Sequence, residues 1–205
     1  MATLYKIGEN IIKTFGQKVV GGKITRQEAI LAGAQASNKL VRDLIWRNKS
    51  DGNETIPYYC FREYRLGIVK DTLRNRWYAK LPIRTLESLY NNRGVYHVAP
   101  ADDIDDLLVP LDSGFNSMFK GLDAFQLEGK LGYTPERDRI YIQGAEFNED
   151  FELFVRLIPD ATSLEPHDEL PAPPELEYDI IMLALQNLGV TMQLPRDVVD
   201  NNLGT

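Results

Sequence analysis

The chain has 205 residues, 43% of them hydrophobic and 26% charged, a composition that excludes wholesale disorder. Its longest apolar run, residues 180–185, is far shorter than the about 20 residues that span a bilayer, and the first residues lack the apolar core of a secretion signal. We therefore expect no membrane partner. The single cysteine, Cys60, cannot form an internal disulfide and fits a reducing compartment.

The net charge of −7 conceals an uneven distribution. Residues 1–100 contain 17 Lys and Arg against 8 Asp and Glu, a net charge of +9. Residues 101–205 contain the remaining 6 against 22, a net charge of −16. Such a division indicates a charged partner or head-to-tail contact between copies, with drift of two solvated surfaces as the alternative.

Residues 1–50 are predicted to form a helical pair. Apolar side chains at intervals of three to four predict a helix over residues 4–20, which a pair of glycines ends. Thr25 and Glu28 have the spacing of a capping box, the start of a second helix that should run to about Arg47. Its alanine-rich beginning permits close approach of another helix. Its expected buried stripe consists of Ile30, Ala34, Leu40, Val41, Leu44 and Ile45.

Residues 51–158 are rich in aromatic and β-branched side chains and predict an antiparallel β-rich region. Strands are expected around residues 61–68, 77–81 and 95–99, and further short strands or turns at 115–119 and 125–127. Two more strands, residues 139–143 and 151–158, each have one apolar face. We expect these two to pair with each other across the acidic loop between them.

Residues 159–205 are predicted to contain a Pro-rich linker, a third helix and a tail. Prolines and acids mark residues 159–174 as an extended linker. A helix should begin at Pro173-Pro174 and end near Gly189, and the tail from Leu194 needs a partner to become ordered. The predicted fold class is therefore α+β, with an N-terminal helical pair, a central antiparallel β-rich region, and a C-terminal helix with an extended tail. The expected buried residues of this helix are Leu176, Ile180, Leu183, Ala184 and Leu188.

Candidate catalytic groups are few. His97 lies in a predicted strand, His167 lies in the linker, and Cys60 has the character of a buried thiol. The glycines of residues 16–23 lack the Gly-Lys-Ser/Thr that a phosphate-binding loop requires, and the aspartates of residues 102–106 lack the spacing of a calcium loop. We predict no enzyme activity, no catalytic residue, no metal site and no cofactor.

Two segments carry a resemblance to known proteins. An aromatic strand ending in Leu-Pro (Arg76-Trp-Tyr-Ala-Lys-Leu-Pro82) precedes Leu86, an Asn/Gly turn and the strand Val95-Tyr-His-Val-Ala-Pro100. The C-terminal part adds the Pro-rich stretch, a helix that begins Pro-Pro-Glu-Leu-Glu, and Pro195-Arg-Asp-Val-Val-Asp-Asn-Asn202. With the two N-terminal helices, this pattern covers most of the chain. It resembles the head-to-tail adaptor and neck-ring proteins of short-tailed bacteriophages, especially crAss-like phages.

The resemblance implies a virion structural protein, made in the bacterial host cytoplasm, that forms a homo-oligomeric ring of twelve copies below the portal. Its partners would be other copies of itself, the portal protein and neighbouring neck and tail ring proteins. Genomic DNA would pass through the channel without sequence-specific binding. One alternative is another tail ring, tail-completion or tail-tube protein. A second is a nucleic-acid-binding module that uses the basic N-terminal half, including Arg74, Arg76, Trp77 and Tyr78.

The predicted partner interface has three parts. The first is the exposed side of the second helix, because Trp and Arg are common anchors, although Trp46 is equally compatible with the core. The second is the acidic loop of residues 102–106, which is expected to meet a basic neighbour. The third is the apolar side chains of the tail. The residues concerned are Arg42, Trp46 and Arg47, then Asp102, Asp103, Asp105 and Asp106, then Leu194, Val198, Val199 and Leu203.

Overall fold

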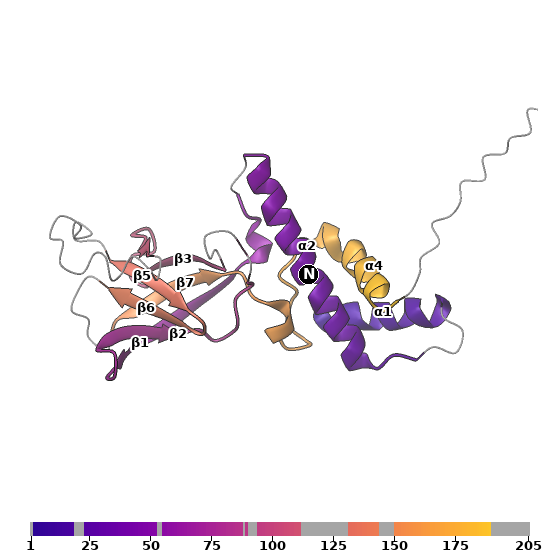
Figure 1. The fold of residues 1–205 in the computed structure, drawn as a ribbon, viewed down its shortest axis with the longest axis horizontal. Coiled ribbons are helices and arrows are strands. Elements are labelled where there is room, and N and C mark those ends of the chain that lie inside the picture. Colours follow the sequence, from indigo (N-terminus) through magenta and orange to yellow (C-terminus); the bar gives the residue numbers. More distant parts are fainter. Residues whose placement is uncertain are drawn as a thin grey trace, which may run out of the picture.

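The computed structural model describes residues 2–18, 23–52, 55–87, 89, 94–111, 131–143 and 150–189. Its helices gather at one end of an elongated molecule and its strands at the other (Figure 1). The expected α+β class is confirmed: N-terminal helices, a central sheet and a C-terminal helix follow one another along the chain. The three α-helices are α1 (Leu4–Lys18), α2 (Arg26–Ser50) and α4 (Glu177–Asn187).

The predicted capping box fixes the start of α2. The Thr25 hydroxyl accepts a hydrogen bond from the Glu28 backbone N–H at 3.2 Å, and Glu28 Oε2 accepts one from the Thr25 N–H at 2.8 Å. These bonds lower the pKa of the Glu28 carboxyl, since they favour its charged form. The helix continues to Ser50, three residues beyond the expected end at Arg47.

Small residues form the buried face of α2. A Cβ atom on Gly8 of α1 would lie 2.8 Å from Ile30 of α2, and one on Gly33 of α2 would lie 2.9 Å from Ile7 of α1. The two helices therefore cross with a glycine of each against an isoleucine of the other. The expected close approach is confirmed, but the expected stripe was too apolar, since three of its members are only half-buried (Ile30, Leu40 and Leu44). The residues that pack most tightly are the small ones.

The C-terminal helix closes this half of the molecule. A 3₁₀ turn, η5 (Pro174–Leu176), leads into α4, and the Gly189 N–H donates to the Gln186 carbonyl at 3.0 Å. Gly189 has a φ of +78°, so it supplies the left-handed cap that the sequence predicted. Of the predicted buried residues, Ile180 and Ala184 are fully buried and the other three are half-buried.

The strands form one curled seven-stranded sheet in the order β3-β7-β1-β2-β6-β5-β4. All neighbours pair antiparallel except β4 and β5, which are parallel. The Leu108 N–H, just before β4, donates to the Val98 carbonyl of β3 at 2.8 Å, so the two ends of the sheet meet. The strands are β1 (Arg62–Asp71), β2 (Arg76–Lys80), β3 (Val95–Pro100), β4 (Val109–Pro110), β5 (Gly132–Glu136), β6 (Arg139–Gln143) and β7 (Glu152–Leu157).

The predicted pairing of residues 139–143 with 151–158 is wrong, although both segments are strands. β6 lies between β2 and β5, and β7 lies between β1 and β3. The reason is β5, a strand the sequence analysis did not foresee because it contains Pro135, and proline is unusual inside strands. A two-residue turn through Arg137, with φ of +54°, folds β5 onto β6 and occupies that edge. The segments expected at 115–119 and 125–127 lie outside the described residues.

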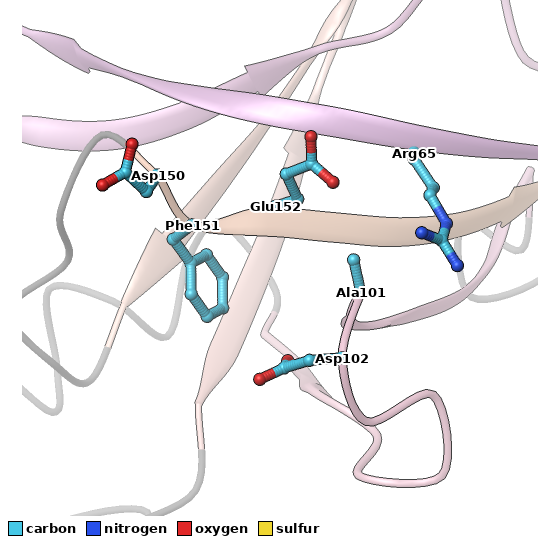
Figure 2. A pocket seen from close by; sticks show the side chains of 6 residues that line it. All are labelled: Arg65, Ala101, Asp102, Asp150, Phe151 and Glu152. Carbon is cyan, nitrogen blue, oxygen red and sulfur yellow. The ribbon is translucent and has the colours of Figure 1, made fainter.

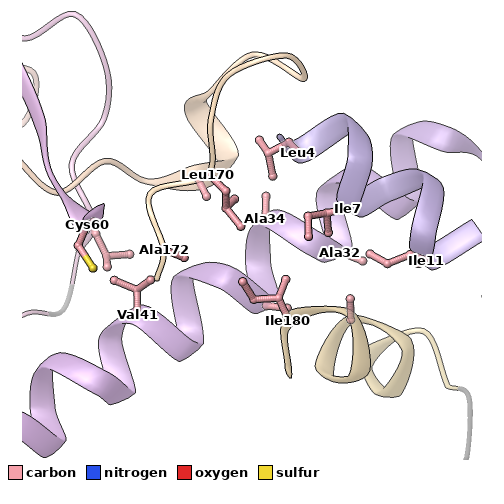
Figure 3. Packing of buried hydrophobic residues seen from close by; sticks show 14 of the residues in the cluster. Leu4, Ile7, Ile11, Ala32, Ala34, Val41, Cys60, Leu170, Ala172 and Ile180 are labelled. Atoms are coloured by element: carbon pink, nitrogen blue, oxygen red, sulfur yellow. The ribbon is translucent and has the colours of Figure 1, made fainter. Parts of the chain in front are cut away.

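The expected linker is a packed part of the helical half. Its backbone bonds to the first residues of the chain: the Tyr5 N–H donates to the Pro166 carbonyl at 2.7 Å, and the Leu170 N–H donates to the Ala2 carbonyl at 2.9 Å. It also buries apolar side chains beside α2, where Ala172 lies near Val41 and Cys60, and Leu170 lies near Ala34 (Figure 3). Residues before 51 and after 158 thus share one core, and a second core lies within the sheet.

Candidate interaction surfaces

The structure brings Trp46 to the surface near the free end of α2, which projects from the molecule (Figure 1). The Trp46 side chain is 43% exposed, and Lys49 Nζ lies 5.6 Å from the centroid of its ring. Arg47 is exposed, whereas Arg42 is half-buried. Of the two readings of Trp46, the structure favours an exposed residue over a core residue.

The acidic loop of residues 102–106 is exposed throughout. Its shape is set by short bonds: Asp103 Oδ1 accepts from the Asp105 N–H at 3.3 Å, and His97 Nε2 lies 3.1 Å from the Ile104 carbonyl. Among the described residues, no group of three or more His, Cys, Asp or Glu is placed to hold a metal ion. The predicted tail residues, Leu194, Val198, Val199 and Leu203, lie outside the described residues.

An open hollow of about 430 Å³ lies beside this loop, and we call it the acidic hollow. The hollow lies where three segments meet: β1, the residues that follow β3, and the start of β7. The Ala101 N–H donates to the Glu152 carbonyl at 2.9 Å, and Glu152 pairs with Gly67 of β1. Three carboxylates and one guanidinium line it together with the Phe151 ring and the Ala101 methyl, and the Phe151 ring points to the opposite side of β7 from the Asp150 and Glu152 carboxylates (Figure 2). Its lining residues are Arg65, Ala101, Asp102, Asp150, Phe151 and Glu152.

The turn between β1 and β2 presents an apolar side chain to solvent. Leu73 is 97% exposed, more than any other large apolar residue in the described part of the chain. Asp71 Oδ1 accepts hydrogen bonds from the backbone N–H groups of Leu73 and Arg74, at 3.0 and 3.2 Å, and Asn75 takes a left-handed φ of +50°. These features give the turn a defined shape. We call residues 70–76 the hairpin tip.

A polar network ties the hairpin tip to the neighbouring strands. Arg74 Nη1 lies 2.8 Å from Glu136 of β5 and 3.4 Å from the hydroxyl of Tyr141 in β6. Asp71 Oδ2 lies 3.7 Å from Arg139 Nη1 and 3.5 Å from the same hydroxyl. Tyr141 is only 2% exposed, so the network is anchored on a buried ring. These contacts hold the base of the hairpin tip against the neighbouring strands, and the Leu73 side chain takes no part in them.

The groups considered for catalysis are engaged in packing. Cys60 is fully buried, and desolvation raises the pKa of its thiol to about 12. The His167 ring stacks on Tyr5 at 5.2 Å, and the His97 ring meets Phe154 edge-on at 5.7 Å. Within the described ranges, no helix combines the length and apolarity needed to cross a membrane.

Neither the models of known protein families nor the curated proteins include a match to this chain. Its surfaces are therefore interpreted from their own chemistry. The sequence analysis named Asp102 as an interface residue, but it did not name Leu73 or group Asp102 with the other residues of the hollow. A signal for Leu73 was present, because an apolar residue between Asp71 and Asn75, both turn formers, sits where two strands join. Asp150 and Glu152 stand out in the sequence only as part of an acidic stretch, because folding alone brings them beside Asp102.

Proposed function

We propose that this chain is a structural subunit of a bacteriophage virion, a ring-forming head-to-tail adaptor of the neck that joins the portal to the tail. The proposal is supported chiefly by one observation: the sheet carries two different surfaces of opposite charge, the basic hairpin tip and the acidic hollow. Members of a ring contact each other through two unlike faces, so a subunit needs such a pair.

The division into a helical half and a sheet half also suits the proposal. The free end of α2 offers Trp46 and Arg47 at a distance from both sheet surfaces, so one part of the molecule remains available for a portal or tail protein while the other contacts ring neighbours (Figure 1). Another ring of the tail, or a tail-completion or tail-tube protein, requires the same surfaces and remains the nearest alternative.

Nucleic-acid binding is the alternative from another class. Its four proposed contacts are partly committed elsewhere: Arg74 pairs with Glu136, and Trp77 packs against the core of the sheet. The Tyr78 ring lies under Arg139, whose guanidinium is 4.5 Å from the ring centroid. Binding to DNA through base stacking requires open aromatic faces, so the arrangement favours contact with protein.

Cryo-EM of the bacteriophage particle tests the proposal. We expect a ring of twelve copies between the portal and the tail, with the fold described above fitting the density. Density for the chain in the capsid wall or in a tail fibre would exclude the adaptor role. Its absence from the particle would exclude any virion role. Retention of the purified chain on duplex DNA at physiological salt, with affinity falling steeply as salt rises, would support the nucleic-acid alternative instead.

A further inference from the structure

We propose that the hairpin tip of one copy docks in the acidic hollow of the next copy. This inference rests on the proposed function and names the contact that would join ring neighbours. It commits to a second copy of this chain as the occupant of the hollow, and the argument rests on charge, shape and rigidity.

The two surfaces have complementary charge. The hairpin tip contains Lys70, Arg74 and Arg76 against Asp71, a formal charge of +2. The acidic hollow is lined by three carboxylates and Arg65, a formal charge of −2, and three further aspartates of the loop follow Asp102 directly. Opposite charges favour this pairing over contact between two tips or two hollows, because like charges at close range are costly.

The apolar parts also correspond. Leu73 stands at the centre of the tip and is 97% exposed, so its whole side chain is available for contact. In the hollow, the Phe151 ring, the Ala101 methyl and Asp102 lie on one side of β7, and the Asp150 and Glu152 carboxylates point to its other side (Figure 2). The hollow is open to solvent and has a volume of about 430 Å³. The apolar side chain of the tip can thus contact the Ala101 methyl and the Phe151 ring, while the basic residues of the tip face the carboxylates that line the hollow.

The tip is preorganised for docking. The Asp71 side chain holds the backbone of Leu73 and Arg74, and the ion pair between Arg74 and Glu136 fixes the tip to β5. A surface that is already ordered loses little conformational entropy on binding. The same ion pair holds the tip against its own sheet beside β5, whereas the hollow lies between β1, β7 and the end of β3. The tip and the hollow are therefore separate, unlike surfaces of one copy, and a head-to-tail contact needs two such surfaces.

Charge reversal tests the contact. One variant carries Lys70→Glu with Arg76→Glu, and a second carries Asp150→Lys with Glu152→Lys. Arg74 is left unchanged, because it belongs to the polar network that holds the tip. A control variant, Lys13→Glu with Lys39→Glu, makes the same charge change as the first variant on exposed residues of the helical half. Circular dichroism establishes that each variant is folded, and sedimentation velocity measures self-association over a range of protein and salt concentrations.

We expect the wild-type chain and the control to associate, more weakly as salt rises. Each reversal variant alone should associate about a hundredfold more weakly, because its tip and its hollow carry like charge. An equimolar mixture of the two reversal variants should associate again, since the acidic tip of one fits the basic hollow of the other, and the basic tip fits the acidic hollow.

Three outcomes would overturn the proposed contact: a wild-type chain that stays monomeric at every concentration, reversal variants that associate as well as the wild type, or a mixture that does not associate. The last two would indicate a different partner or surface for the hollow. The contact and the proposed function fail separately. If the mixture associates but the chain is absent from the virion neck, the contact is retained and the adaptor role is excluded. If the chain is found in the neck but the mixture does not associate, the adaptor role is retained and the contact is excluded.

Discussion

Replacing Asn38 with alanine should lower the free energy of unfolding by about 2 kcal/mol. The Asn38 side chain joins α2 to the packed stretch after β7: its Nδ2 donates to the Asp160 carboxylate at 2.6 Å, and its Oδ1 accepts from the Ala161 N–H at 2.9 Å. A hydrogen bond to a charged group contributes about 1.5–3 kcal/mol and a neutral one about 0.5–1.5 kcal/mol. Water reaches this half-buried site, and alanine favours helix by about 0.5 kcal/mol, so the lower part of the combined range applies.

Urea denaturation of the wild type and of Asn38→Ala measures this difference. Gln35→Ala is the matched control, because Gln35 is an exposed residue of the same helix and its replacement should change stability by less than about 0.5 kcal/mol. A loss for Asn38→Ala no larger than that of the control would refute the assignment of these two bonds as the tie between α2 and the stretch after β7.

The pH dependence gives a second check on the same tie. Burial raises the pKa of Asp160, but the hydrogen bonds from Thr162 and Asn38 outweigh it, so the net pKa lies below the ordinary value of 3.8. A lowered folded-state pKa stabilises the fold above the ordinary value and ceases to do so as pH falls through the folded-state value. The difference between wild type and Asn38→Ala should therefore be full at neutral pH and shrink below about pH 4. A difference that stays constant into strong acid would show that the Asp160 charge plays no part.

Two further substitutions address the helical core. Gly33→Ala should destabilise the chain by about 1 kcal/mol, because the new methyl lies 2.9 Å from Ile7 and the cost of overpacking exceeds the gain in helix propensity. Gly16→Ala should stabilise the chain by up to about 1 kcal/mol, because nothing lies within 4 Å of the new methyl. Thermal or urea unfolding measures both changes. Equal effects at the two glycines would contradict the close crossing of α1 and α2. Cys60 should resist a thiol reagent at pH 8 in the folded protein and react only as the chain unfolds, since its thiol is buried with a pKa of about 12; rapid stoichiometric labelling of the native chain would contradict its burial.

The helical half was predictable because its signals are local. A capping box needs only Thr25 and Glu28, and a C-terminal cap needs only Gly189 after an apolar stripe. The prediction of buried residues in α2 was partly wrong because it followed hydrophobicity alone. At a helix crossing, distance between backbones decides burial, so Gly33 and Ala36 lie deeper than Leu40. Periodicity alone does not reveal which turn of a helix is crossed.

The sheet was predictable in its strands and not in its pairing. Alternation of side chains identifies a strand such as β7, but nothing in its sequence distinguishes β1 and β3 from β6 as neighbours. The pairing of β6 depends on β5, and Pro135 made β5 hard to predict as a strand. The acidic hollow depends on that pairing, because Asp102 and Glu152 are 50 positions apart and meet only when β7 lies beside β3.

The division of charge along the sequence does not become a division in space. β1 and β2 come from the basic half of the chain and β6 and β7 from the acidic half, yet the sheet places β1 beside β7 and β2 beside β6. Ion pairs cross that boundary in both senses: Arg74 pairs with Glu136, and Glu63 pairs with Arg156. Because such pairs occur in both senses, they leave the imbalance between the two halves of the chain in place. The hairpin tip and the acidic hollow are two places where this imbalance lies at the surface, and contact between copies can use it there.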